Sequence, residues 1–289
     1  MSNAVAAGDT PLGIICGGGS VPFAVAQAVA GRGRQIVLLP LIGWADEQAV
    51  EPYPHHWVHL GQFGRLCRLA RNAGCRDLVF IGTLIRPSPW KCRFDLLTLK
   101  LIPQILRAFR GGDDHLLSGI GRLFESQGFR MLGAHEVAPE ILVAKGALGS
   151  RVPSARDLED IKLGLAVIAA AGPFDVGQAA VVANGHVIAF EAIEGTDQML
   201  ARVAELRRNG RFRAPPGAGV LVKAPKPDQD RRFDLPAVGP PTVENVARAG
   251  LAGIAIVAGG TVMAEPQRVA KLADEAGIFV VGVTPGNQP

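Results

Sequence analysis

The sequence predicts an α/β protein with an N-terminal doubly wound, Rossmann-like parallel sheet and a C-terminal mixed α/β domain. Two observations predict the parallel sheet. An apolar strand pattern near the start runs through a glycine turn into a helix pattern, and strand and helix patterns then alternate. A third observation makes the second half mixed, because Asn184-Gly185 between two apolar runs is a strong signal for a hairpin with a primed turn.

The first half gives three strand patterns and the helices between them. We expect strands at residues 12–16, 35–40 and 77–82, and helices at residues 23–30 and 65–73. Ligands of doubly wound sheets bind at the carboxyl ends of the strands. In this chain those ends are residues 17–20 and Gly82-Thr83.

A basic and strongly apolar stretch follows at residues 90–110. Pro103 interrupts it, so we expect two short helices rather than one. Such a segment can lie on a membrane surface or line an apolar groove. The alternative is an ordinary core helix whose cations extend toward solvent.

The second half begins within residues 134–153 and continues with further strand and helix patterns. We expect helices at residues 157–171, capped by Ser154, and at residues 194–208, and a helix after Thr242. Strands are expected at residues 179–183, 186–190, 219–222 and 253–258, with a last helix and strand ending near Val283.

Composition narrows the class of protein. The 289 residues carry a net charge of +4, and no apolar run reaches the roughly 18 residues of a membrane span. No signal peptide is visible, so we expect a cytoplasmic protein. The four cysteines lack C-x-x-C spacing, which gives no sign of a zinc site or a disulfide framework. Few aromatics and no aromatic-basic run make nucleic acid the weakest of the anionic partners.

The densest block of charge lies at residues 223–234, directly after an apolar strand pattern. It combines acidic and amide side chains with cations: Asp228, Gln229, Asp230, Asp234, Lys223, Lys226, Arg231 and Arg232. Pro225 and Pro227 exclude a helix and stiffen the backbone. Carboxylates can hold Mg²⁺ and a water, and cations can hold phosphate, so the block suits phosphoryl chemistry. The alternative is a solvated, salt-bridged surface loop.

Two glycine turns follow predicted strands, at residues 17–20 and 258–261. Backbone N–H groups in such turns can bind phosphate, although tight packing explains many of them equally well. The first turn is not a Walker motif, because no Gly-Lys-Ser/Thr follows it. Asp113-Asp114 can hold a metal or cap a helix, and Glu194 and Asp197 are likewise ambiguous between capping and catalysis.

Together these segments resemble the LpxI-type family of UDP-2,3-diacylglucosamine pyrophosphatases of Gram-negative lipid A synthesis. The resemblance covers residues 12–285 and rests on the order and spacing of residues 16–22, 82–83 with Arg86-Pro87, 113–117, 194–197, 223–234 and 258–261. Ser20-Val21 departs mildly from the family pattern, and the charged block shows no departure.

The resemblance implies two domains with the ligand between them. It implies Mg²⁺-dependent hydrolysis of the UDP-sugar pyrophosphate to UMP and 2,3-diacylglucosamine 1-phosphate. Asp228 matches the family's essential acid and is expected to bind Mg²⁺ or orient the water, with Asp230 and Asp234 supporting it. Lys223, Lys226 and Arg232 would neutralise phosphate charge. The substrate-binding residues that we expect are Gly18, Gly19, Ser20, Gly82, Thr83, Arg86, Asp113, Asp114, Glu194, Thr196, Asp197, Gln229, Thr242, Gly260 and Thr261.

The resemblance also implies a function for each expected domain. Residues 1–10 would be a tag or disordered start, 11–133 the nucleotide-binding domain, 134–152 a linker, and 153–286 the catalytic and lipid-binding domain. The expected partners are the UDP-diacylated sugar, the anionic inner membrane surface as a peripheral contact, and a second copy in a homodimer.

Two alternatives belong to other classes of protein. Another nucleotide-sugar or nicotinamide enzyme would need an acid at the end of the second strand, where Pro40 stands instead. A non-catalytic carrier of acylated sugar phosphates would explain the apolar stretch and the cations, but not the concentration of acids.

Overall fold

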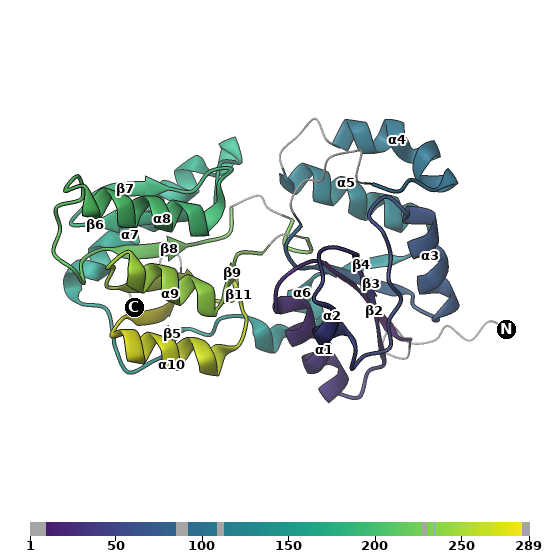
Figure 1. Ribbon diagram of the computed structural model, residues 1–289, viewed down its shortest axis with the longest axis horizontal. Coiled ribbons are helices and arrows are strands. Elements are labelled where there is room, and N and C mark those ends of the chain that lie inside the picture. Colours follow the sequence, from purple (N-terminus) through teal and green to yellow (C-terminus); the bar gives the residue numbers. More distant parts are fainter. Residues whose placement is uncertain (1–9, 85–91, 109–112, 227–229, 234, 285–289) are drawn as a thin grey trace. The chain divides into compact units, whose positions relative to one another are not determined.

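The computed structural model describes residues 10–84, 92–108, 113–226, 230–233 and 235–284 (Figure 1). The chain divides into two compact units. Unit 1 comprises Met1–Ile141 and Asp230–Asp234, and unit 2 comprises Leu142–Gln229 and Leu235–Pro289. The main boundary therefore falls inside residues 134–152. The charged block is divided as well, because its last five residues belong to unit 1.

Unit 1 contains the predicted parallel sheet. Its order is β2-β1-β3-β4, and all neighbouring pairs are parallel. The strands are β1 (Leu12–Cys16), β2 (Ile36–Pro40), β3 (Asp77–Ile81) and β4 (Arg130–Leu132). Cys16 lies opposite both Pro40 and Ile81, so the carboxyl ends of the three longer strands share one edge.

The helices of unit 1 cover this sheet and build its core. They are α1 (Val21–Gly31), α2 (Glu47–Val50), α3 (Phe63–Asn72), α4 (Leu96–Ala108), α5 (Asp113–Ser126), α6 (Ala134–Val137) and the 3-10 helix η2 (Pro139–Ile141). Side chains from strands and helices pack together in the core, among them Ile15, Leu39, Leu66, Leu78 and Phe124. Burial of these apolar surfaces stabilises the unit.

The prediction of two short helices around Pro103 is wrong. Helix α4 is a single helix with Pro103 inside it. Asp95 accepts a hydrogen bond from the Thr98 amide at 2.9 Å and so caps the start of the helix. Thr98 and Leu101 are buried, and the Thr98 hydroxyl donates to the Gly61 carbonyl. Packing in the first turns thus offsets the one backbone hydrogen bond that proline removes.

Unit 2 contains a mixed sheet of order β5-β12-β10-β8-β6-β7. The strands are β5 (Gly146–Ala147), β6 (Ala179–Ala183), β7 (His186–Phe190), β8 (Val220–Lys223), β10 (Gly253–Val257) and β12 (Phe279–Val283). Strands β8, β10 and β12 are parallel, whereas β5, β6 and β7 pair antiparallel with their neighbours. The mixed sheet predicted for this half is confirmed.

The predicted hairpin joins β6 to β7. Asn184 and Gly185 have φ angles of 56° and 76°, the left-handed pair that a primed turn needs. Their amides donate to the two carboxylate oxygens of Asp160 at 2.9 and 2.7 Å. The turn is therefore held by a helix residue as well as by its own strands.

The helices of unit 2 are α7 (Ala155–Ala171), the 3-10 helix η3 (Gly172–Phe174), α8 (Gly195–Arg208), α9 (Pro240–Arg248) and α10 (Pro266–Ala276). Ser154 caps α7 as predicted, because its hydroxyl accepts from the Asp157 amide. The short strands β9 (Ala237–Val238) and β11 (Val262–Met263) pair in parallel. Among the helices of the described ranges, none has the length and apolar character needed to cross a membrane.

Candidate active site

The carboxyl edge of the parallel strands in unit 2 collects several predicted site residues. Ile256 pairs with Lys223, and Val257 pairs with Val283, so β8, β10 and β12 end at the same edge. Lys223 is the last residue of β8, and the turn of residues 258–261 follows β10. Ligands of open α/β sheets bind at such edges.

Lys223 is buried, with 7% of its surface exposed. Its Nζ donates to the Thr196 hydroxyl at 2.9 Å and to the Ala237 carbonyl at 3.2 Å. Thr196 lies in the first turn of α8 and donates its own hydrogen to Glu191 Oε1 at 2.6 Å. A buried ammonium requires such oxygens. The cation at the end of β8 is thus held by hydrogen bonds to two other elements, α8 and β9.

The second glycine turn packs directly against the start of the charged block. A Cβ on Gly260 would lie 3.1 Å from Pro225 Cγ and 3.2 Å from Val257 Cγ1, so this position leaves little room for a side chain. Thr261 is fully buried, and its hydroxyl has no hydrogen-bond partner among the described residues. A buried polar group of this kind calls for an explanation, and a ligand oxygen would supply one.

Lys226 forms an ion pair with Asp175 in unit 2. Asp175 follows η3 and has a left-handed backbone, with φ of 50°. The pair holds the described start of the charged block against the loop before β6. No local sequence pattern marks Asp175 as the partner of Lys226, because 51 residues separate the two.

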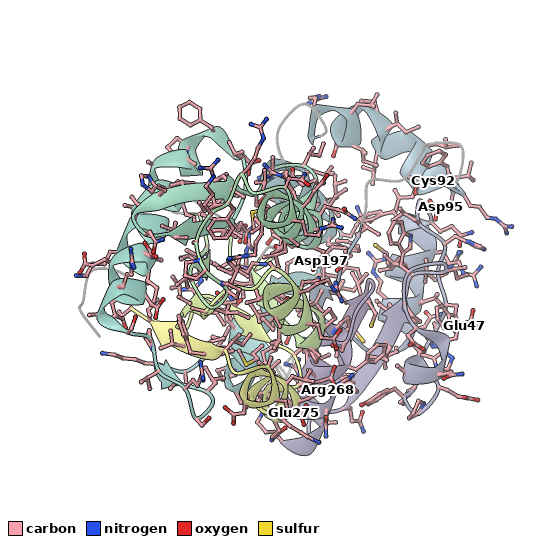
Figure 2. All side chains as sticks on the ribbon, turned by 60° about the vertical axis from the view of Figure 1, so that its left-hand side comes forward. Glu47, Cys92, Asp95, Asp197, Arg268 and Glu275 are labelled. Carbon is pink, nitrogen blue, oxygen red and sulfur yellow. The ribbon has the colours of Figure 1, made fainter. Side chains whose placement is uncertain are left out.

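The other predicted residues of unit 2 that the structure describes lie on α8 and α9 or, for Glu194, directly before α8. Asp197, which is labelled in Figure 2, lies on α8. Its carboxylate accepts a hydrogen bond from the Asn245 side chain at 2.9 Å and so joins α8 to α9. Glu194 pairs with Arg202 at 2.7 Å. Thr242 is nearly buried in the first turn of α9. The carboxylates of Asp197 and Glu194 therefore have structural partners on the helices.

The first glycine turn, in unit 1, is built by close backbone packing. Gly18 and Thr83 exchange two backbone hydrogen bonds of 2.8 Å. A Cβ on Gly82 would lie 2.8 Å from the Gly17 carbonyl carbon and the Gly18 oxygen. The packing explanation thus applies to Gly17, Gly18 and Gly82. Gly19 and Ser20 are exposed.

Gly19 and Ser20 are the part of this turn that remains suited to an anion. They lead into α1, and the Ser20 side chain makes no capping hydrogen bond. The first N–H groups of a helix have no intrahelical partners. Pro22 has no N–H, so the donors that the start of α1 keeps for a phosphate are the amides of Val21 and Phe23.

Asp230 and Arg232 belong to unit 1. Arg232 donates to both carboxylate oxygens of Asp230, with Nη2–Oδ2 at 2.8 Å and Nε–Oδ1 at 3.0 Å. It also pairs with Glu125 on α5 at 2.8 Å. These bonds from Arg232 hold the pKa of Asp230 below its usual value, and partial burial opposes them. Asp230 therefore stays ionised and orients Arg232.

Phe233 anchors the same turn by packing on α5. A Cβ on Gly121 would lie only 2.1 Å from the Phe233 ring, so the glycine makes room for the ring. The turn itself is closed by a hydrogen bond from the Phe233 amide to the Asp230 carbonyl at 3.0 Å.

Several predicted residues lie outside the described residues: Arg86, Asp228, Gln229 and Asp234. Asp113 and Asp114 start α5, but their side chains are likewise not described. Within the described ranges, no three His, Cys, Asp or Glu side chains form a group that could hold a metal ion. Of the three predicted metal ligands, only Asp230 is described, and Arg232 bonds both of its oxygens.

The protein is a two-domain α/β protein. At the carboxyl edge of the parallel strands of unit 2 it has a buried cation, Lys223, and a buried hydroxyl, Thr261, that has no hydrogen-bond partner among the described residues. Comparison with known families identifies the one to which it belongs. The LpxI N-terminal domain matches residues 11–141, and the LpxI C-terminal domain matches residues 144–281. The chain belongs to the LpxI family.

A curated relative supports the same family. The chain is 41% identical over 278 residues to the UDP-2,3-diacylglucosamine pyrophosphatase LpxI of Caulobacter vibrioides. The match covers 96% of this chain and 99% of the relative. The family resemblance predicted from the sequence is confirmed.

Proposed function

We propose that this protein hydrolyses the pyrophosphate bond of UDP-2,3-diacylglucosamine to UMP and 2,3-diacylglucosamine 1-phosphate, a step of lipid A biosynthesis. Family membership and the activity named for the relative support the proposal. The observation that carries it in the structure is the buried Lys223 at the end of β8, fixed by Thr196 and Ala237. A non-catalytic carrier of acylated sugar phosphates remains the alternative for the test.

Hydrolysis of a pyrophosphate bond is accelerated by positive charge and by fixed hydrogen-bond donors near the phosphates. Water adds its oxygen to one phosphorus, the bridging P–O bond breaks, and the leaving phosphate keeps the bridging oxygen. Negative charge grows on that oxygen, and a preorganised ammonium stabilises it without reorganisation. Lys223 would supply this charge, and the Thr261 hydroxyl would supply a hydrogen bond at the same edge.

The nucleotide would bind unit 1. We assign its phosphate to the exposed start of α1, at Gly19 and Ser20, where helix N–H groups are free of intrahelical partners. Gly18, Gly82 and Thr83 would shape this turn through their mutual backbone bonds.

The proposed activity would require Mg²⁺, which would polarise a phosphoryl oxygen and activate water when bound. Arg232 donates to both oxygens of Asp230, so a metal at this carboxylate would have to share these oxygens with the guanidinium. The expected acid Asp228 and the expected ligand Asp234 lie outside the described residues. The metal requirement is therefore tested directly: excess EDTA should abolish turnover, added Mg²⁺ should restore it, and full turnover in verified metal-free enzyme would exclude it.

The acylated substrate would reach the protein at the cytoplasmic face of the inner membrane, with α4 as the contact. Leu96, Leu99 and Leu106 are exposed by 80, 49 and 59% and recur at i, i+3 and i+10, on one face. The exposed cations Lys100 and Arg107 lie beside them. Apolar residues bordered by cations suit an anionic lipid surface.

Leu97, one of the apolar side chains of the stretch that we expected to lie on a membrane or line a groove, packs inside unit 1 instead. Leu97 packs on α3, where a Cβ on Gly64 would lie 2.9 Å from the Leu97 Cβ. Phe109, near the end of the same apolar stretch, lies outside the described residues. We therefore propose the exposed face of α4, rather than Leu97, as the lipid contact.

The test is incubation of purified protein with UDP-2,3-diacylglucosamine and quantification of UMP by chromatography. The proposal predicts stoichiometric release of UMP and 2,3-diacylglucosamine 1-phosphate with repeated turnover. A carrier would instead bind the substrate and return it intact. Binding without any UMP would therefore reject the enzyme and favour the carrier.

A further inference from the structure

We propose that Glu191 is a positioning residue of this reaction, acting on Lys223 through Thr196. The inference rests on the proposed function, since it concerns the cation assigned to the leaving phosphate. The three side chains come from different elements: Glu191 follows the end of β7, Thr196 starts α8, and Lys223 ends β8.

The hydrogen bonds of this chain can run in one direction only. An ammonium has no acceptor, so Lys223 Nζ donates to Thr196 Oγ1 at 2.9 Å. The Thr196 hydroxyl has a single hydrogen, and the carboxylate of Glu191 can only accept it, at 2.6 Å. Glu191 thereby turns the lone pairs of Thr196 toward Lys223.

Glu191 is itself fixed by a second bond. Its other oxygen, Oε2, accepts from the Gln178 backbone amide at 2.9 Å. Both oxygens must therefore accept at once. A glutamine at this position has one oxygen, so it can accept from Gln178 or from Thr196 but not from both. If its NH₂ group faces Thr196, it competes with Lys223 for the same hydroxyl oxygen.

Loss of the Glu191 or Thr196 hydrogen bond should affect the reaction through the position of the Lys223 ammonium. Lys223 has a long side chain, and loss of one of its hydrogen bonds leaves the ammonium less well placed at the strand end. Misplacement of a preorganised charge weakens the transition state more than the ground state. We therefore expect lower kcat with little change in KM when Glu191 or Thr196 loses its role.

The experiment compares five variants for UMP release from UDP-2,3-diacylglucosamine: Glu191→Gln, Thr196→Val, Thr196→Ser, the double variant Glu191→Gln/Thr196→Val, and Glu159→Gln. The last is the matched control, because Glu159 pairs with Lys162 on the exposed face of α7. We expect Glu191→Gln and Thr196→Val each to lower kcat by about 10- to 100-fold with KM within twofold. Thr196→Ser, which keeps the hydroxyl, should retain most of the wild-type kcat.

The double variant distinguishes a chain from two separate contributions. Residues that act through one another are non-additive, so the double variant should be no slower than the slower single variant by more than about twofold. Additive losses, or a kcat within twofold of wild type in folded Thr196→Val, would overturn the inference. Should Glu191→Gln not fold, the contrast between Thr196→Val and Thr196→Ser decides the question.

A spectroscopic readout separates this inference from the proposed function. The side-chain ammonium of Lys223, assigned in a ¹⁵N-lysine spectrum with a Lys223→Arg variant, should shift or broaden in Glu191→Gln and Thr196→Val but not in Glu159→Gln. Absence of UMP in the wild type would reject the proposed function alone. An ammonium signal unchanged by both variants would reject the chain from Glu191 to Lys223, whatever the activity.

Discussion

Asp77, at the start of β3, shows how single residues of this protein depend on their partners. Its side chain is 4% exposed and pairs with Arg34 at 2.6 Å and Arg130 at 2.8 Å. Burial alone would raise the pKa of Asp77, but the hydrogen bonds from Arg130 and Arg34 outweigh it and hold the pKa below its usual value. The carboxylate is thus ionised in the folded protein and stabilises it.

This pairing predicts a pH-dependent cost for Asp77→Asn. A carboxylate with a lowered folded pKa stabilises fully above its unfolded pKa of about 3.9, and the contribution disappears as pH falls through the folded value. At pH 7 the variant should lose about 2–3 kcal/mol, less than a fully buried pair, because Arg34 is largely buried but the Arg130 side chain is half exposed to solvent. The loss should shrink steadily below pH 4.

The measurement is urea unfolding followed by tryptophan fluorescence. Trp44, Trp57 and Trp90 all lie in the sequence range of unit 1, as does Asp77, so the signal reports this unit. Glu140→Gln, which breaks an exposed pair with Arg32 in the same unit, is the control and should change stability by less than about 0.5 kcal/mol. A loss in Asp77→Asn that is equal at pH 7 and pH 3 would contradict the electrostatic explanation.

Gly82 gives a second prediction at this scale. Its φ is +104°, and a Cβ would come within 2.8 Å of backbone atoms of Gly17 and Gly18. Gly82→Ala should therefore destabilise unit 1 by more than about 3 kcal/mol, through strain and a backbone clash together. Gly33→Ala isolates the strain, because Gly33 has φ of +81° with open space around it, and should cost only about 1 kcal/mol. Equal losses in the same fluorescence assay would show that the clash has no effect.

The sequence predicted the place of some candidate site residues in the fold but not of others. Lys223 and Thr261 stand at the ends of apolar strand patterns, and general rules about sheets place such residues at one edge. Glu191 and Asp175 were missed, since their partners are set by the hairpin and the sheet order. Asp230 was taken with Asp228 as one acidic group, but its bidentate pairing with Arg232 is a matter of turn geometry that composition does not reveal.

At the scale of elements, strong periodic patterns predicted the structure well. The strands β1, β2, β3, β6, β7, β8 and β10 and the helices α1, α3, α7 and α8 lie close to their expected bounds. The two-residue strands β5, β9 and β11 are too short to show a period. Helix α4 was mispredicted because a local rule about proline ignores the packing of Thr98 and Leu101.

The exposed face of α4 predicts membrane binding. Replacing Leu96, Leu99 and Leu106 together by serine should reduce cosedimentation with phosphatidylglycerol-containing vesicles at least tenfold, because each leucine loses about 1.5 kcal/mol or more of apolar burial. Neutral vesicles should bind the wild type more weakly. Serine at Val152, Phe174 and Ile193, apolar residues of unit 2 that are on average more exposed, provides the control. Equal vesicle binding by the two triple variants would contradict the assignment.

At the scale of the whole molecule, the division of the charged block is the feature that sequence order conceals. Lys223 and Lys226 belong to unit 2, whereas Asp230, Arg232 and Phe233 belong to unit 1. Residues 223–234 are therefore divided between the two compact units, and the residues in each unit have different partners. The two-domain architecture itself was predictable, because the hairpin signal distinguishes the second half from the parallel first half.

The expected acid of this block gives a prediction for the complete enzyme. Asp228→Ala should lower kcat on the order of 10³-fold or more while substrate binding is retained, as expected for loss of a group that orients water or metal. Turnover and substrate affinity are measured separately, by UMP release and by calorimetry. A variant that keeps more than a tenth of wild-type turnover would show that Asp228 is not essential.

Lys223, at the edge of the unit 2 sheet, is the residue that we propose to stabilise the breaking pyrophosphate bond. Single-turnover UMP release by Lys223→Met tests this role most directly, since methionine keeps most of the side-chain volume and removes the charge. We predict a fall of about 10²–10³-fold in the rate, in a protein whose circular dichroism and thermal unfolding match the wild type. A rate within threefold of wild type in that folded variant would show that the charge of Lys223 is not needed for the reaction.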